Sequence, residues 1–324
     1  MNLTKSNLAK SIAFAGLSAV LGCSQAFADG GFATRDLNPI LQPIYLPTLA
    51  TFNPQNGWKI DHSVYITNTL QEETRGDESL LIDVENYRYE LGIRYRQDKW
   101  LARLDLPFIS NSAGALDSAI DDWHQFFGLP GGNRDKFPHD EINIDYQRDG
   151  SGAYHQDKSS SGIGDMALAF GYQADARFAW FAGIELPTGD ADDFSGNEAV
   201  DTALWFTYQN KVNQEMGIFA LLGVSFPGDG GHLEGLLVDQ IWVAQAGFDY
   251  RFKPSIVGTL QFDYHSQTIE NSELKAFGNS LQAQFGLGFM DLFGDHRLDF
   301  FFSEDILVGS APDISFGLRL SRAY

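Results

Sequence analysis

The sequence predicts an all-β fold: a transmembrane antiparallel up-and-down β-barrel of about twelve strands, with a short helix in one long extracellular loop. Three observations predict it: an export leader, apolar and polar residues that alternate along many segments, and short connections that alternate with long ones. Aromatic residues make up 14% of the chain and glycine contributes 33 residues, which favours strands joined by turns. No apolar run after the leader is long enough for a membrane-spanning helix.

Residues 1–28 have the anatomy of a secretory signal peptide. Lys5 and Lys10 precede an apolar run at 12–21, and a small-residue cleavage site ends at Ala28. Residues 20–23 also resemble a lipoprotein cleavage box, in which Cys23 would be lipidated. Both processing routes stay open. Because the chain has one cysteine, cleavage after Ala28 would leave a mature protein without disulfides.

Twelve segments alternate between apolar and polar residues, as strands with two different faces do. Along 280–289, for example, apolar residues at the odd positions oppose Gln282 and Gln284. A soluble sandwich would show the same period, but small and charged residues on the polar face suit a water-filled lumen. The predicted strands are 58–69, 80–97, 100–109, 163–173, 178–187, 201–210, 216–226, 238–252, 256–266, 280–289, 296–304 and 313–324.

The connections between these segments supply an independent test. Short ones follow every second strand and alternate with longer ones at 70–79, 110–162, 188–200, 227–237, 267–279 and 305–312. Short periplasmic turns, long external loops and an even strand count are typical of outer-membrane barrels. We therefore expect the last strand, 313–324, to pair with 58–69 and close the barrel.

Charged and amide side chains within the strands should point into the lumen, because charges at mid-depth are costly against lipid. The functional interpretation is a lumen that sets selectivity; the alternative is a salt-bridged core that fills a narrow barrel. Both stay open at this point. The candidate lumen residues are Arg88, Glu90, Arg94, Arg96, Arg103, Asp105, Asp249, Arg251, Asp263, Gln282, Gln284, Arg297, Asp299 and Arg319.

Two segments fall outside the strand pattern. Residues 29–57 precede the barrel domain 58–324, and three prolines within residues 32–47 make this segment unsuitable as a central strand. They are either a periplasmic lead-in or a plug in the barrel mouth. The extracellular loop 113–161 is far longer than usual, and Asp117 can cap a short helix in it. That helix would fold into the lumen as a constriction or lie on the rim, and its shared apolar face consists of Ile120, Trp123 and Phe127.

The segment Arg35-Asp36-x-Asn38-Pro39, together with the loop segment at 128–133, resembles a family of Gram-negative envelope proteins described only as a domain of unknown function. The resemblance extends over the mature chain. It implies a barrel, and it brings no established substrate and no catalytic residues.

The leading functional hypothesis is a passive, porin-like channel for small solutes, and the alternative is a non-conducting structural or adhesion barrel. A barrel-wall lipid hydrolase is the third. Its candidate pairs are His62-Ser63 and His265-Ser266, but neighbours in a strand point to opposite faces, and no Gly-x-Ser-x-Gly elbow is present. We expect no enzyme activity, no catalytic residue, no cofactor and no metal site.

The expected location is the bacterial outer membrane, reached through a cleaved signal peptide. The expected partners are outer-membrane lipid and lipopolysaccharide, the barrel-assembly machinery and a small solute. A net charge of −21 argues against nucleic acid as a partner.

Overall fold

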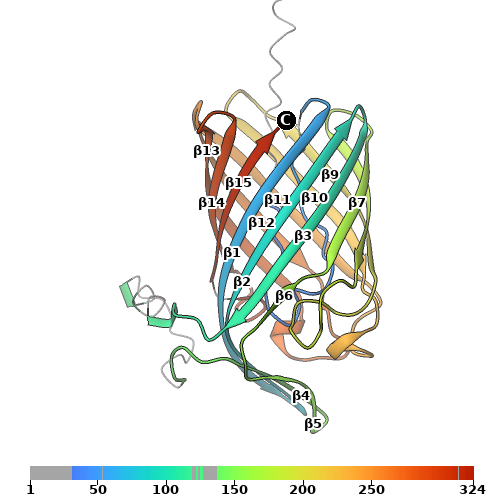
Figure 1. Ribbon diagram of the computed structural model, residues 1–324, viewed down its shortest axis with the longest axis vertical. Coiled ribbons are helices and arrows are strands. Elements are labelled where there is room, and N and C mark those ends of the chain that lie inside the picture. The colour runs from blue at the N-terminus through green and yellow to red at the C-terminus, as the bar shows by residue number, and fades with distance from the viewer. Residues whose placement is uncertain (1–30, 53, 119–121, 123–124, 127–136, 313) are drawn as a thin grey trace, which may run out of the picture.

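A closed barrel of twelve antiparallel strands forms the body of the protein (Figure 1). This computed structural model describes residues 31–52, 54–118, 122, 125–126, 137–312 and 314–324. β15 pairs with β1, with Lys59 opposite Ala323, so the prediction of a barrel closed by the last strand is confirmed. The barrel strands are β1 (Gly57–Arg75), β2 (Glu78–Gln97), β3 (Trp100–Ser112), β7 (Met166–Gln173), β8 (Phe178–Leu186), β9 (Asp201–Lys211), β10 (Met216–Phe226), β11 (Ile241–Lys253), β12 (Ile256–His265), β13 (Ser280–Leu292), β14 (His296–Asp305) and β15 (Ile314–Ala323).

The two ends of the barrel differ. At one end, here called the turn end, short connections join the strands, and the backbones of Trp58 and Tyr324 exchange hydrogen bonds of 3.2 and 2.8 Å where the first and last strands meet. The opposite end, the loop end, carries most of the long connections and the short 3-10 helices η2 (Gly231–Leu233) and η3 (Lys275–Phe277). None of the helices in the described part of the chain is long and apolar enough to cross a membrane.

A β-sheet extension projects from the loop end, where we had predicted loops. β1 ends at Arg75 and β2 begins at Glu78, so a turn of two residues joins them. The prediction of a loop at 70–79 is therefore wrong, because most of these residues are paired strand. Within the predicted loop 110–162, β4 (Asn143–Arg148) pairs with the start of β2, and β5 (Ser151–Gln156) pairs with β4. β6 (Ser160–Ile163) pairs with the end of β3. β4, β5 and the paired ends of β1 and β2 form the extension beyond the rim, where the membrane pattern of one apolar face no longer applies (Figure 1). β6 instead continues the line of β7 along β3.

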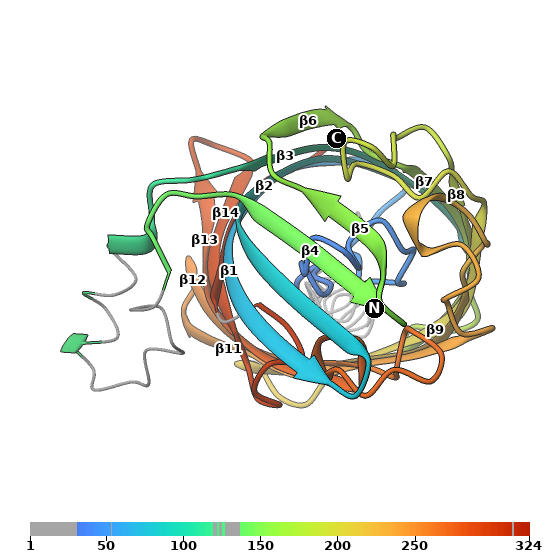
Figure 2. The ribbon, with the colours of Figure 1, turned by 90° about the horizontal axis from the view of Figure 1, so that it is seen from below.

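Residues 31–52, here called the plug segment, lie inside the barrel. Figure 2, seen from the loop end, shows this segment in blue within the ring of strands, with β4 and β5 in front of the mouth. The segment has two legs joined by a tip, where the backbone N–H groups of Leu41 and Gln42 donate to the Asn38 carbonyl at 2.9 and 2.8 Å. Nearly all of its residues are buried.

The inner wall formed by β7–β11 is largely apolar, unlike the wall across from it. Phe181, Trp205 and Phe219 belong to one buried cluster with Ile44 and Leu49 of the plug segment. The same cluster continues at the loop end, where side chains of the extension and of the long connections cover the mouth: Leu80, Ile82, Ile144, Tyr146, Tyr154, Leu233, Ile269, Leu274 and Phe277. We call this loop-end part the lid cluster.

The outer face of the barrel is apolar and aromatic. Trp100 and Trp180 are 64% and 59% exposed near the turn end, and each ring packs against an aromatic ring of the neighbouring strand. Aromatic side chains at the end of a lipid-facing surface are typical of the interface between membrane and water.

The closed lumen as a candidate functional site

The candidate lumen residues lie on the inner wall, and most of them are buried. Arg96 and Arg251, both near the turn end, are the partly exposed members of the set. The residues with less than a tenth of their surface exposed are Arg88, Glu90, Arg94, Arg103, Asp105, Asp249, Asp263, Gln282, Gln284, Arg297, Asp299 and Arg319.

The buried arginines of the wall pair with neighbouring carboxylates. Asp299 accepts from Arg297 at 2.7 Å and from Arg319 at 2.9 Å, and none of its surface is exposed. Asp105 holds Arg94 at 2.7 Å and also contacts Arg103. Each carboxylate therefore joins two strands and holds two guanidinium groups, which is how a buried charge is made tolerable.

The first leg of the plug segment is held by amide side chains of β12 and β13. Gln261 accepts from the N–H of Phe32 at 2.7 Å and donates to its carbonyl at 3.2 Å, so one side chain hydrogen-bonds to both backbone groups of Phe32. The Thr34 hydroxyl lies 2.7 Å from Asp263 Oδ2 and 2.6 Å from Gln284 Oε1. The wall thus uses its polar groups to bind a chain segment rather than to seal the lumen by itself.

The ring of Phe32 sits in a cradle on the wall. It stacks on Phe301 with 4.3 Å between ring centroids and 20° between planes, and the guanidinium of Arg319 lies 5.7 Å from its centroid. Gly286 is required beneath it, because a Cβ atom there would collide with the ring. The cradle anchors the first leg through a single large side chain.

The second leg is held mainly through its backbone. The Tyr45 N–H donates to Asp201 Oδ2 at 2.8 Å, and the Tyr45 carbonyl accepts from the Ser225 hydroxyl. The Leu49 N–H donates to Gln245 Oε1 at 2.8 Å. The contacts of both legs therefore spread around the wall and leave no strand pairing between the plug segment and the barrel.

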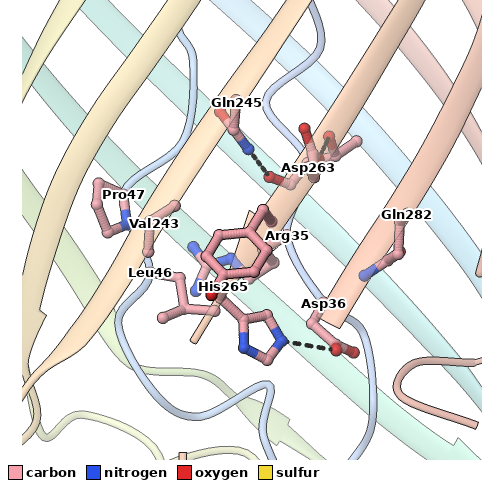
Figure 3. Close-up of a pocket in the computed structure, with 11 residues that line it drawn as sticks. Arg35, Asp36, Leu46, Pro47, Val243, Gln245, Asp263, His265 and Gln282 are labelled. Carbon is pink, nitrogen blue, oxygen red and sulfur yellow. Dashed lines mark hydrogen bonds and ion pairs between the residues drawn. The ribbon is translucent and has the colours of Figure 1, made fainter. Parts of the chain in front are cut away.

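A small pocket remains beside the first leg (Figure 3). His265 Nε2 and Asp36 Oδ2 face each other there at 3.0 Å, and Gln282 lies on the adjoining strand. Arg35 crosses to the far wall, where its guanidinium lies 3.8 Å from the Glu185 carboxylate. These pairs fix the Arg35-Asp36 segment inside the barrel, where the sequence left open a plug or a periplasmic lead-in.

One row of residues across seven neighbouring strands is entirely uncharged. Each member lies opposite the next in the strand register, and each is buried. Because barrel strands tilt, the row descends from near the loop end of β3 to the middle of β12. This neutral polar row consists of Asn111, Asn86, Thr67, Ser315, Ser303, Gln284 and Gln261.

At the loop end, buried carboxylates hold the connections in place. Asp165 accepts from the N–H groups of Gly189 and Asn197 at 2.7 and 2.9 Å, and burial raises the pKa of its carboxyl group. Glu78 accepts from the Tyr146 hydroxyl at 2.7 Å and from the Ser272 hydroxyl at 2.9 Å, which ties the extension to the 266–279 connection.

In neither candidate hydrolase pair does the histidine side chain hydrogen-bond to the serine hydroxyl. His62 is exposed on the outer face, 2.8 Å from the Tyr89 hydroxyl, whereas Ser63 is buried on the inner face. His265 pairs with Asp36, and the Ser266 hydroxyl accepts from the Trp242 N–H at 2.9 Å. No group of three metal-ligating side chains occurs among the residues that the structure describes.

The predicted apolar helix face in the long loop is not described by the structure, and one feature of the inner wall was not predicted. Ile120, Trp123 and Phe127 lie outside the described residues, although Asp117, Ser118 and Phe126 at the edges of that segment are helical. The apolar inner wall of β7–β11 was not predicted. The signal was present in β10, where Phe219 and Leu221 alternate with apolar residues of the other face, so both faces are apolar.

The family described as "Protein of unknown function (DUF3187)" matches residues 15–324. The chain belongs to this family. No curated protein matches it. Its fold is similar to the crystal structure of the COG4313 outer membrane channel from Pseudomonas putida F1, with a TM-score of 0.55 and 13% identity over 84% of this chain and 97% of that one. The KdgM porin gives a TM-score of 0.44 and 7% identity, covering 82% and 99% of the two chains. The CymD monoaromatic hydrocarbon channel gives a TM-score of 0.42 and 11% identity, covering 90% of this chain and 94% of that one.

Proposed function

We propose that the protein is a passive outer-membrane channel for small solutes, and that the plug segment closes its lumen. One observation carries the proposal: the polar groups of the wall bind a chain segment that is not itself a strand of the barrel. Gln261, Gln245 and Asp201 all hydrogen-bond to backbone groups of residues 31–52. If the segment withdraws, these groups line a polar path through the barrel, as in other membrane barrels whose interior is polar.

The test is ionic conductance with the plug segment free and with it fixed. Thr34→Cys and Asp263→Cys replace side chains whose oxygen atoms lie 2.7 Å apart, so a short bis-methanethiosulfonate reagent can bridge them through two reducible disulfide bonds. A Cys23→Ser background removes the chain's own cysteine. In planar bilayers we expect intermittent openings, their loss on bridging, and their return after reduction. Conductance that is unaffected by the bridge would contradict closure by the plug segment, and a folded barrel without any openings would contradict the channel.

The second candidate function is a non-conducting structural barrel. It is favoured by the lid cluster, in which Leu80, Tyr146 and Phe277 lie buried over the mouth that the plug tip also fills. A channel must move both layers, whereas a structural barrel moves neither. The same bilayer recordings separate the two functions.

The outward aromatic surface supports lipid and lipopolysaccharide as neighbours, and export and insertion by the barrel-assembly machinery would follow from that location. The side chains of His62 and Ser63 lie on opposite faces of β1, which supports a protein without hydrolase activity. We place the loop end outside the cell, since long loops are external in barrels of this class.

A further inference from the structure

The neutral polar row differs in charge from the wall around it. Its members are hydroxyl and amide side chains, which both donate and accept hydrogen bonds. Several charged neighbours are paired with one another, as Arg88 is with Glu90 at 3.0 Å and Arg319 with Asp299 at 2.9 Å. Asp263 differs, because its carboxylate accepts hydrogen bonds from the row members Gln261, at 2.7 Å, and Gln284. The row therefore offers hydrogen bonds without net charge.

Hydrogen-bonding capacity along this wall is not used up. Within the described residues, Asn86 Oδ1, Thr69 Oγ1 and Ser280 Oγ have no hydrogen-bond partner, and each of these side chains is at most 2% exposed. Thr69 follows Thr67 on the same face of β1, and Ser280 precedes Gln284 on the same face of β13. Because buried polar groups are normally paired, these atoms point to a polar ligand of the open lumen.

An aromatic platform adjoins the row. Phe301 lies two residues before Ser303 on the inner face of β14, and the Phe32 ring of the plug segment covers it. Gly317 on the neighbouring strand leaves room for the Phe301 ring. Withdrawal of the plug segment would uncover a flat apolar ring next to hydroxyl and amide groups.

We infer that the neutral polar row and Phe301 form a binding path for an uncharged, hydroxyl-rich solute, a neutral oligosaccharide, which takes the place of the plug segment. The inference rests on the proposed channel function. Sugar hydroxyl groups match the donors and acceptors of the row, and the apolar face of a sugar ring matches Phe301. An acidic solute would bring a further negative charge beside Asp263 and beside ion pairs that are already complete, which disfavours it.

Solute and plug segment compete, because Gln261, Gln284 and Phe301 contact the plug segment in the closed lumen. The apparent association constant for a solute is then the intrinsic constant of the open state multiplied by the fraction of molecules that are open. Phe32→Ala, which weakens the closed state, should raise the apparent affinity for a neutral sugar.

The experiment measures binding of maltotriose to the full-length protein in detergent by calorimetry, with trigalacturonate as the acidic probe and N-acetyl-trialanine amide as the amide probe. We expect maltotriose to bind and both other probes to bind at least about tenfold more weakly, the effect of losing one or two hydrogen bonds. Thr67→Val and Asn86→Leu remove row groups at similar volume and should each weaken maltotriose about tenfold. Thr74→Val, the same change at an exposed position of β1, should have no effect.

Heat-modifiable migration and ionic conductance of each variant establish that it is folded. Equal binding of the three probes, preference for the acidic or amide probe, or row variants that bind like Thr74→Val would each overturn the inference while leaving a conducting channel in place. Absence of ionic conductance in both the native protein and Phe32→Ala would instead overturn the proposed function, and the inference with it.

Discussion

Phe32→Ala should open the lumen. The side chain is 1% exposed, stacks on Phe301 and lies beneath Arg319, and all three features exist only while the plug segment is in place. Replacing a buried phenylalanine by alanine typically costs about 3–5 kcal/mol. Because the open state lacks these contacts, the cost falls on the closed state alone.

A difference of about 3 kcal/mol changes an equilibrium constant by about 100-fold. The ratio of open to closed molecules should rise by about that factor in Phe32→Ala. It should rise less in Phe301→Ala, because Phe301 also packs on Tyr65 of the wall, a contact that both states keep. Phe300→Ala is the matched control, since Phe300 precedes Phe301 on β14 but is 47% exposed on the outer face. Open probability in planar bilayers measures the effect directly.

A second readout follows the plug segment itself. Thr34→Cys, in the Cys23→Ser background, should react faster with a membrane-impermeant thiol reagent when Phe32→Ala is added. The reasoning would be refuted if Phe32→Ala and Phe301→Ala opened no more often than Phe300→Ala and the thiol introduced by Thr34→Cys reacted at an unchanged rate.

Three further outcomes are expected. Asp299→Asn leaves two buried guanidinium groups without their carboxylate and should lower the unfolding free energy by about 3–5 kcal/mol in urea titrations, whereas exposed Asp295→Asn should change it by less than about 0.5 kcal/mol. Glu78→Ala removes the acceptor that ties the extension to the 266–279 connection, so limited proteolysis should cut that connection faster; an unchanged cleavage rate would argue against the tie. Phospholipid hydrolysis should be absent in the native protein and unaffected by Ser63→Ala or Ser266→Ala, and any activity lost in these variants would restore the enzyme hypothesis.

Most of the barrel could be predicted because its pattern is local. Each strand must place lipid-compatible residues on one face, so alternation in a segment such as 280–289 marks both the strand and its orientation. The pattern failed where that requirement ends. Beyond the rim, Glu72 is exposed and Glu73 accepts from the Lys275 N–H at 2.7 Å, so β1 no longer alternates between apolar and polar residues, and the strand there was mistaken for a loop.

The candidate site could be predicted only in part. Inward charges such as Arg94 and Asp299 were identifiable because lipid excludes them from the other face. Their partners were not, because Arg319 reaches Asp299 from another strand and the choice depends on register.

The sequence by itself determined the alternation, the order of turns and loops and the closing role of the last strand, since each depends on neighbours along the chain. Only the tertiary structure decided that residues 31–52 fill the lumen, that Phe32 rests on Phe301, and that seven uncharged residues join into one row. The physical reason is that these features join residues far apart in the chain. Thr34 and Gln284, for example, are 250 positions apart, and strand register and barrel closure alone bring them together.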